Sequence, residues 1–402
     1  MKEKELPEGW VWVRLDDITS KFINGGTPST AIPEYWNGSI LWTTSKSITS
    51  YTISAGEKFI SHDAIEKSST NIIPKDNVLI ASRVGIGKSA VNLIDIAISQ
   101  DLTGIILDKK QISLEFLVRY LHTPKILRML ESNARGSTIK GLQRSDLERI
   151  GIPLPPLPIQ RQIVAVLEQA EAVKRQRQEA DALTGALLQS VFYEMFGDPV
   201  KNEMGWKVTA VEEICEPSRP ITYGIVQPGE ETDDGIPIVR PSDLLDTYVN
   251  NNIGLKKVDP KIESEYPRSR LKGGEFLISV RGTMGPMSIA GPDLADANLS
   301  RGVALVAPNS TCCSEYLLFL FKNPTMQQVV VDTSKGIALK QFNLIDLKKM
   351  QIPLPPLALQ QQFARVVEEV EWLRERQAAS GKEIEGLCEG LMQKAFEGEL
   401  VV

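Results

Sequence analysis

The stretch that decides the fold is Ile152-Pro153-Leu154-Pro155-Pro156-Leu157, because the same six residues return as Ile352-Pro353-Leu354-Pro355-Pro356-Leu357. The offset, from 152 to 352, is 200 residues. An identity of this length, continued by further matches at the same spacing, indicates an internal duplication. The glutamines that continue the match are Gln160 and Gln162 after the first copy and Gln360 and Gln362 after the second.

The duplication covers the whole chain. Farther upstream the offset drifts from 200 to 198 and then 196, as small insertions would cause, so each copy is a globular part followed by a Pro-rich hinge and a helix. We therefore expect globular domains at 1–157 and 198–357 and helices at 158–197 and 358–402. The matched pairs include Gly136 and Gly336, Lys140 and Lys340, Arg83 and Arg281, and Trp10 and Trp206.

Each globular part shows a mixed pattern. Short runs rich in Val, Ile and Thr between Gly, Pro, Asn and Asp clusters predict strands, and one longer segment with helical spacing in each copy predicts a helix. The expected strands include 77–81, 105–107, 275–280 and 303–306, and the expected helices are 114–130 and 315–331.

The segments after the two hinges have the heptad pattern of a coiled coil, with apolar residues at alternating spacings of four and three. Two matched stripes of this length predict that the two helices pack on each other. The first seam is Ile159, Ile163, Val166, Ala170, Val173, Ala180, Leu187 and Val191, and the second is Leu359, Phe363, Val366, Val370, Leu373, Ile384, Leu387 and Leu391.

Both seams turn polar at matched positions, Arg177 and Gln377. If the helices run antiparallel, these two residues face each other, and Gly197 and Gly398 are plausible helix ends. The predicted fold class is therefore α/β: two tandem mixed α/β domains separated by two long antiparallel coiled-coil helices, in a pseudo-two-fold internal repeat.

The composition, 42% hydrophobic and 24% charged, is typical of a folded chain, and no apolar run is long enough to span a membrane. The net charge of −6 argues against contact with phosphates, but 9 acidic and 5 basic residues lie in 358–402, against 17 and 19 in 1–157. A modest basic face is therefore compatible with the sequence. We expect the four cysteines to be reduced thiols of a cytoplasmic protein.

A duplicated chain with paired helices favours DNA as the ligand. Two similar domains on an antiparallel helix pair would present two copies of one surface related by a near two-fold axis, as duplex DNA also has locally. Such a protein can place two readers in major grooves about 34–36 Å apart. Because the two copies have diverged in sequence, the two half-sites should differ.

Several short motifs are specific together and weak singly. They are Leu6-Pro7-Glu8-Gly9-Trp10, Gly25-Gly26-Thr27-Pro28-Ser29, Arg83-Val84-Gly85-Ile86-Gly87-Lys88, the twin hinges, and the helix ends at 187–192 and 391–396. In these features the chain resembles the specificity subunits of Type I restriction-modification systems, over essentially its full length.

The resemblance implies two target-recognition domains that read the halves of a bipartite DNA site. It implies that the two helices dock two modification subunits, which bind S-adenosylmethionine and methylate adenine. Two restriction subunits, which use ATP and Mg, are implied as further partners. No cofactor, metal or membrane is expected for the chain itself.

Candidate DNA contacts are exposed polar and basic side chains, because bases are read by Arg, Lys, Asn, Gln, Ser or Thr and phosphates by basic or small polar donors. Each of them could equally be a solvated charge or a structural pair. The candidates are Thr44, Lys46, Ser47, Arg83, Lys88, Arg135, Ser137, Lys140 and Arg144 in the first copy, and Arg240, Ser242, Arg268, Arg270, Arg281, Lys335 and Lys340 in the second.

Enzyme motifs fail on inspection. Gly87-Lys88-Ser89 lacks the upstream glycine of a phosphate-binding loop, because position 82 is Ser. The Pro-Pro pairs are the hinges and are not flanked as in an adenine methyltransferase. We therefore expect a non-catalytic chain. Two alternatives remain open: a two-headed protein-interaction scaffold, and a relic that folds but no longer selects a site.

Overall fold

The computed structural model describes residues 6–136, 140–250, 254–281, 285–334 and 342–400. The chain forms two compact units, which we describe separately. Unit 1 comprises Met1–Gln176 with Gly381–Val402, and unit 2 comprises Arg177–Ser380. Each unit thus contains one globular part, the first half of one long helix and the second half of the other.

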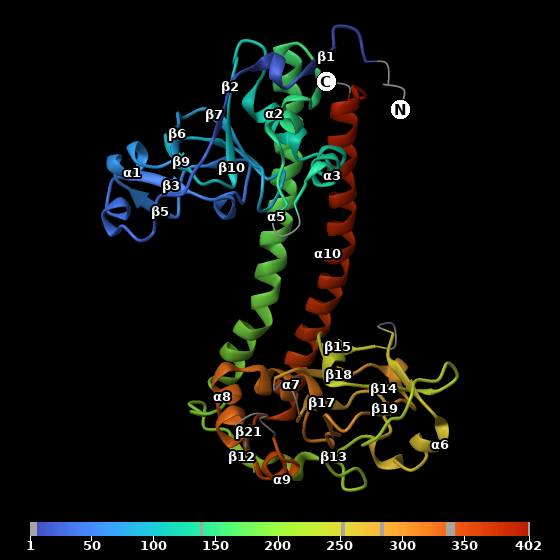
Figure 1. Cartoon of the computed structure of the whole chain (residues 1–402). Coiled ribbons are helices and arrows are strands. Elements are labelled where there is room, and N and C mark those ends of the chain that lie inside the picture. Colours follow the sequence, from blue (N-terminus) through green and yellow to red (C-terminus); the bar gives the residue numbers. More distant parts are fainter. Residues whose placement is uncertain (1–5, 137–139, 251–253, 282–284, 335–341, 401–402) are drawn as a thin grey trace. The chain divides into compact units, whose positions relative to one another are not determined.

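Unit 1 is built on a five-stranded sheet of order β2-β10-β7-β8-β4 and a four-stranded sheet of order β5-β3-β9-β6 (Figure 1). A separate strand pair, β1 with β11, leads into the long helix. Its strands are β1 (Val11–Arg14), β2 (Thr19–Asn24), β3 (Ile40–Thr43), β4 (Thr52–Ile53), β5 (Lys58–Ile60), β6 (Asn71–Ile73), β7 (Asn77–Ala81), β8 (Ser89–Asn92), β9 (Ile96–Ile98), β10 (Leu102–Leu107) and β11 (Gly151–Leu154). Its helices are α1 (His62–Glu66), α2 (Leu114–Leu121), α3 (Pro124–Asn133), α4 (Arg144–Glu148) and the first half of α5 (Leu157–Phe196).

Unit 2 repeats this plan with sheets of order β13-β20-β17-β18-β15 and β16-β14-β19 and the strand pair β12 with β21. Its strands are β12 (Lys207–Ala210), β13 (Thr222–Tyr223), β14 (Ile236–Val239), β15 (Tyr248–Val249), β16 (Lys256–Val258), β17 (Phe276–Ser279), β18 (Met287–Ala290), β19 (Asn298–Leu299), β20 (Val303–Val306) and β21 (Gln351–Leu354). Its helices are α6 (Pro260–Glu263), α7 (Ser314–Lys322), α8 (Pro324–Thr333), α9 (Leu344–Lys349) and the first half of α10 (Leu357–Glu397). The predicted mixed α/β class, strands and long helices are confirmed.

The single helices predicted at 114–130 and 315–331 are wrong in one respect, because each is two helices. The first helix ends at Leu121 and the next begins at Pro124; in unit 2 the break lies at Asn323-Pro324. Proline fits the first turn of a helix but disfavours helical backbone in the residue before it. Apolar periodicity continues across both breaks, because the two short helices present their apolar faces to the same core.

A close approach of two backbone segments explains why a glycine stands at the same place after β2 and after β13. A Cβ on Gly25 would lie 2.1 Å from the carbonyl oxygen of Ser99, and a Cβ on Gly224 would lie 1.8 Å from that of Leu299. Only glycine leaves room for the chain leaving β2 or β13 to cross the end of β9 or β19.

The repeated hinge motif forms a strand and then starts a helix. Ile152 and Ile352 are fully buried, and the carbonyls of Pro156 and Pro356 accept the first helical N–H groups of α5 and α10. The long helices end before Gly197 and Gly398, whose φ angles of 75° and 74° are left-handed, as predicted.

Helix halves pack antiparallel inside each unit. In unit 1, Nζ of Lys174 lies 2.7 Å from Oε1 of Glu385, and four residues earlier on α5 the carbonyl of Ala170 lies 3.5 Å from Sγ of Cys388. In unit 2, the side-chain amide of Gln377 lies 3.0 Å from Oγ1 of Thr184. Residues later in α5 therefore face residues earlier in α10, as expected for antiparallel helices.

Arg177 and Gln377 meet in unit 2, as predicted. With its amide oriented so that the oxygen faces the guanidinium, Gln377 accepts a hydrogen bond from Nη2 of Arg177 at 2.8 Å. Arg177 also pairs with Asp181 at 2.8 Å.

Part of the predicted seam does not face the partner helix. Val173 and Leu387 in unit 1, and Leu187 and Leu373 in unit 2, are exposed. Leu188, next to Leu187, is buried instead, and the polar seam residue Gln377 is buried as well. Polar contacts join the two helices at the middle of the pair, and these four apolar residues stay outside the contact.

Each unit completes its core with the helix end that arrives from the other repeat. In unit 1, Phe396 of α10 packs on Phe116 and Tyr120, with ring centroids 5.1 and 5.2 Å away. In unit 2, Phe192 of α5 packs on Tyr316 and Phe363 at 5.7 and 5.5 Å. Burial of such aromatic side chains is a large apolar contribution to stability.

The repeated glutamines join the start of each long helix to the globular part. Gln160 is fully buried; its Oε1 accepts from the backbone N–H of Ser113 at 2.8 Å, and its Nε2 donates to the carbonyls of Gln111 and Pro155 at 3.0 and 2.8 Å. Gln360 makes the same three bonds, to Cys313, Thr311 and Pro355.

Neither long helix, nor any other helix among the described residues, combines the length and the apolar character that a membrane span requires.

We predict that Gln160→Ala lowers the free energy of unfolding by about 1–3 kcal/mol, because it leaves a buried N–H and two carbonyls without their partner. Urea titration followed by circular dichroism measures the change. Gln162→Ala is the matched control, because Gln162 is exposed on the same helix turn. Equal destabilisation by the two substitutions would contradict this role for Gln160.

Candidate nucleic-acid interface

Three groups of predicted contacts in unit 1 lie at one end of the sheets. Strands β2 and β7 end there, and β8 and β10 begin there, because Thr103 pairs with Asn24 and Ile80 pairs with both Thr103 and Ser89. We call this end loop edge 1 and define it by residues 24–27, 44–47, 82–88, 99–101, 135–136 and 140–144.

Hydrogen bonds bring the loops of loop edge 1 together. The N–H of Ser99 donates to the carbonyl of Thr43 at 2.9 Å, which joins the end of β3 to the turn before β10. The N–H of Leu142 donates to the carbonyl of Ser82 at 2.8 Å, which joins the 135–144 segment to the β7–β8 turn. Segments far apart in sequence thus form one polar edge.

Unit 2 has the equivalent loop edge 2, defined by residues 223–226, 240–243, 280–281, 285 and 300–302. The N–H of Ser300 donates to the carbonyl of Val239 at 2.9 Å, and the N–H of Phe342 donates to that of Val280 at 3.1 Å. The two loop edges therefore share a backbone plan while their side chains differ.

Several candidates of loop edge 1 are engaged by neighbouring side chains. The hydroxyls of Thr44 and Ser47 both donate to Glu57. Nε of Arg144 lies 2.6 Å from Glu148. Arg135 donates to Oε1 of Gln143 at 3.2 Å.

The remaining described candidates of loop edge 1 are exposed. Arg83 and Lys88 lie on the β7–β8 turn, Lys46 follows β3, and Lys140 directly precedes Gly141 in the chain. Ser137 lies outside the described residues.

Loop edge 2 holds Arg240, Ser242 and Arg281. Arg240 forms a two-point ion pair with Asp243, with Nε–Oδ2 and Nη2–Oδ1 distances of 3.1 and 3.0 Å, and Asp243 raises the pKa of Arg240. Ser242 is exposed and donates to Asp243 at 3.2 Å. The guanidinium of Arg281 lies 5.7 Å from the ring centroid of Tyr223. Lys335 and Lys340 lie outside the described residues.

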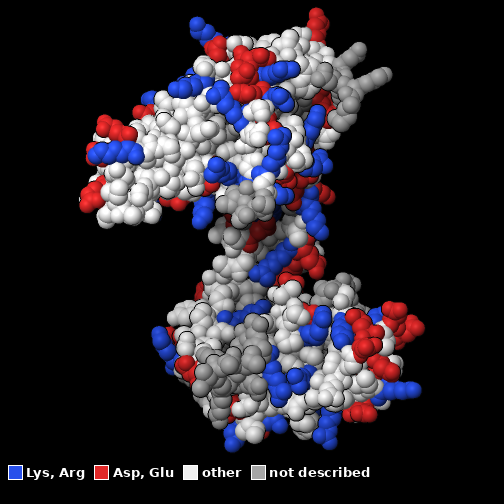
Figure 2. Space-filling model, viewed as in Figure 1, with Lys and Arg blue, Asp and Glu red and all other residues white. Residues whose placement is uncertain are grey.

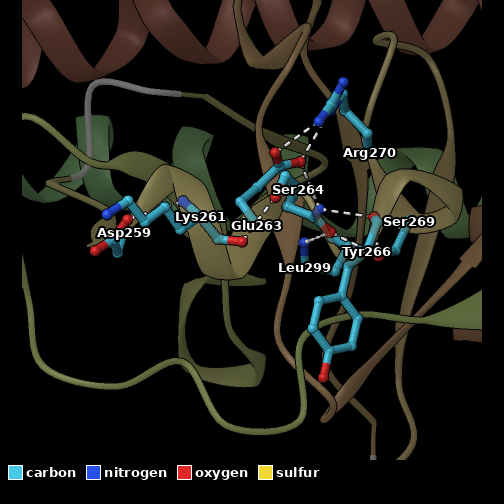
Figure 3. Close-up of polar contacts among 9 residues, drawn as sticks. Asp259, Lys261, Glu263, Ser264, Tyr266, Ser269, Arg270 and Leu299 are labelled. Carbon is cyan, nitrogen blue, oxygen red and sulfur yellow. Dashed lines mark hydrogen bonds and ion pairs between the residues drawn. The ribbon is translucent and has the colours of Figure 1, made fainter.

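Arg270 belongs to an internal network of unit 2 (Figure 3). Nε and Nη2 of Arg270 contact the Glu263 carboxylate at 2.9 and 2.6 Å, and Glu263 also accepts from Nδ2 of Asn298 at 2.9 Å. Glu263 and Asn298 are buried, so this network holds α6 against the start of β19. Arg268 is exposed in a short helix, Pro267–Ser269, that lies against β13.

The Arg270 guanidinium holds the pKa of Glu263 below its ordinary value by hydrogen bonding, and Asn298 acts in the same direction. The equivalent region of unit 1 has an apolar cluster of Trp42, Ile60, Ala64 and Ala97. Unit 2 also has an apolar cluster there, with Ile225, Ile238 and Val258, and the Glu263–Arg270–Asn298 network lies beside it.

Two exposed residues at the loop edges were missed by sequence reasoning: Gln100 on the β9–β10 turn and Arg301 on the β19–β20 turn. Their equivalence follows from strand register, since Thr43 pairs with Ile98 and Val239 pairs with Leu299. A single identity, Ser99 with Ser300, links the two turns, and it is too short to reveal the correspondence without the topology.

Basic and acidic side chains are mixed on the surface. Figure 2 shows Lys and Arg side chains interspersed with Asp and Glu on the visible face of each unit. Among the described residues, no group of three or more His, Cys, Asp or Glu side chains could hold a metal ion. The four cysteines are free thiols.

The chain is similar in sequence to a known protein family and to several of its members. Residues 7–181 and 203–383 match the family described as the Type I restriction modification DNA specificity domain. The chain is 30% identical over 309 residues to the Type I restriction enzyme EcoBI specificity subunit of Escherichia coli, a match that covers 70% of this chain and 65% of that subunit. It is 26% identical over 391 residues to the MjaIX specificity subunit of Methanocaldococcus jannaschii, covering 90% and 87%.

A solved structure shares the fold. A chain from a study of complex assembly and conformational transition of the type I R-M system aligns with a TM-score of 0.69 and 22% identity, covering 99% of this chain and 100% of that one.

We predict that the Glu263–Arg270 pair makes stability pH-dependent. Because the pKa of Glu263 is lowered on folding, its contribution is present above the unfolded pKa and is lost as pH falls through the folded pKa. Glu263→Gln should lower the free energy of unfolding at pH 7 by about 1–3 kcal/mol and flatten its fall below about pH 4.5. Denaturant titrations from pH 7 to pH 3 measure both effects.

Glu265→Gln is the control for this experiment, because Glu265 is exposed two residues away. A parallel pH profile for the wild type and Glu263→Gln would show that the pair does not contribute.

Proposed function

The chain belongs to the family of Type I restriction modification DNA specificity domains, and on that basis we propose that it reads a bipartite, asymmetric DNA site and docks modification and restriction subunits there. Loop edge 1 reads one half of the site and loop edge 2 reads the other. The observation that carries the proposal is the repeat of one loop-edge backbone plan with different side chains, described above for both units.

Different side chains on one backbone plan support different half-sites. Both edges present basic and small polar groups, which suit phosphates and base edges. Apart from Arg270, which pairs with Glu263, the predicted contacts among the described residues remain candidates: Thr44, Lys46, Ser47, Arg83, Lys88, Arg135, Lys140 and Arg144 in unit 1, and Arg240, Ser242, Arg268 and Arg281 in unit 2. Residues already paired internally, such as Arg240 with Asp243, supply rigidity to the loop even where they do not touch DNA.

The exposed apolar residues of the helices support the docking of modification subunits. In unit 1, Val173 on α5 is 49% exposed and directly precedes Lys174, and Leu387 on α10 is 62% exposed and lies two residues after Glu385, the ion-pair partner of Lys174. Leu373 and Leu187 hold the repeat-equivalent positions in unit 2, at 40% and 43% exposure. Contiguous exposed apolar patches mark contact sites for partners, and we propose that these exposed residues belong to such a surface in each unit.

Two equivalent apolar pairs suit two copies of one partner, so we propose two modification subunits. In this assignment they bind S-adenosylmethionine and methylate adenine, and two restriction subunits supply ATP- and Mg-dependent cleavage. The specificity chain itself is non-catalytic, holds no cofactor and acts in the cytoplasm.

The decisive experiment exchanges residues 1–157 for those of another family member. We predict that methylome sequencing of cells carrying the exchanged chain and its modification subunit shows one half of the methylated motif changed and the other half kept. Each unit has its own loop edge and core, so the two halves should be read independently. The reciprocal exchange of residues 198–357 is the control and should change the other half only.

Alteration of both halves by one exchange would refute independent reading. A complex with no sequence motif at all would favour the protein-interaction scaffold, which shares the helices and the duplicated domains but needs no DNA sequence.

We predict that Val173→Asp combined with Leu373→Asp removes co-purification of the modification subunit, because a carboxylate at a desolvated contact is costly. The thermal melting of the chain alone should change little, since both residues are exposed. Leu245→Asp is the matched control, an apolar residue that is 77% exposed and lies outside the helices. Unchanged co-purification would place the docking surface elsewhere.

A further inference from the structure

We propose that Gln100 of unit 1 and Arg301 of unit 2 are the equivalent base-reading residues of the two loop edges, and that Gln100 reads an adenine and Arg301 a guanine. The proposal rests on the DNA-recognition function proposed above. It assigns specificity to two positions that differ between the repeats.

The two residues occupy the same position of the same turn. The N–H of Leu102 donates to the carbonyl of Ser99 at 3.0 Å, and the N–H of Val303 donates to that of Ser300 at 3.1 Å. Gln100 and Arg301 are therefore the second residue of a four-residue turn, the position from which a side chain projects at the tip.

The backbone around each residue is held from both sides. In unit 1, the N–H before Gln100 bonds to the end of β3, and the carbonyl after it accepts from Ser82 at 2.8 Å. In unit 2, Ser300 bonds to Val239, and the carbonyl of Gly302 accepts from Val280 at 2.8 Å. Arg301 has a further bond, from its own N–H to the carbonyl of Ile225 at 2.8 Å. Base reading needs such a fixed backbone, because a bidentate contact tolerates little displacement.

Both side chains are exposed, and neither has a hydrogen-bond or ion-pair partner in the described part of the chain. Several other polar groups at the loop edges differ in this respect. Arg144, Arg240 and the hydroxyl of Thr44 are bound to carboxylates. Side-chain donors that have no protein partner and stand on a rigid turn are available for hydrogen bonds to a base.

Residues that are identical in the two repeats suit phosphate contacts, whereas equivalent residues that differ suit base contacts. Arg83 and Arg281 hold equivalent turns and are the same residue, so they suit the phosphate backbone, which is the same in both half-sites. Gln100 and Arg301 hold equivalent turns and differ, so they suit what differs between the half-sites. The glutamine amide matches the N6 and N7 pattern of adenine, and the guanidinium matches O6 and N7 of guanine.

The test uses the full chain in complex with its modification subunit. The wild-type methylated motif is established first by methylome sequencing, and methylation rates are then measured on duplexes that carry each base at each motif position. In Arg301→Gln, one guanine of one half-site should lose about tenfold to a hundredfold preference, with adenine favoured at that position. In Gln100→Arg, one adenine of the other half-site should be replaced by guanine.

Arg301→Lys should keep a weakened guanine preference, because the ammonium still donates to O6 and N7. Arg281→Gln is the matched control; it should lower the rate on every duplex without changing the motif. Thermal melting should be unchanged in all four variants, since the side chains are exposed or half-exposed.

A uniform loss of rate with the motif intact in Arg301→Gln and Gln100→Arg would overturn the proposal and reduce both residues to phosphate contacts. An unchanged rate and motif would overturn it as well. A wild-type complex without a two-part motif would instead overturn the proposed function, and this inference with it.

Discussion

The anchoring of each long helix by a buried glutamine is the constraint on which the rest of the structure depends. Gln160 and Gln360 satisfy a backbone N–H and two carbonyls where a globular part meets a helix start. Without that amide, polar groups would be buried unpaired, which is costly. The glutamine thus fixes the helix start against α2 or α7, and through those helices against the sheets that form the loop edges.

Much of the fold was predictable because the duplication and the heptads are strong patterns. The six-residue hinge identity indicated two equivalent units, and the ends of α5 and α10 followed from Gly197 and Gly398. The break at Pro124 was missed because apolar periodicity continues through it. The exposure of Val173 and Leu387 was missed for a different reason: a heptad pattern does not distinguish residues that pack on the partner helix from residues that stay exposed.

The candidate site was predictable by residue type but not by pairing. Sequence reasoning found the three segments that the topology of unit 1 joins into loop edge 1, because Arg, Lys, Ser and Thr cluster in them. It could not show that Arg270 is bound by Glu263, since the partner lies on α6 and the burial arises only in the fold. It also passed over Gln100 and Arg301, because the two residues differ and only one neighbouring identity, Ser99 with Ser300, links their turns until strand register places them together.

The exchange of helix ends between repeats has a consequence for biosynthesis. Phe396 and the neighbouring Leu391 and Met392 complete the core of unit 1 around Phe116, yet they leave the ribosome more than 270 residues after Phe116. The apolar surface of unit 1 around Phe116 therefore stays uncovered while nearly all of the rest of the chain is translated. Nascent chains with such unfilled surfaces are prone to aggregate, so this protein is expected to depend on chaperone protection late in translation.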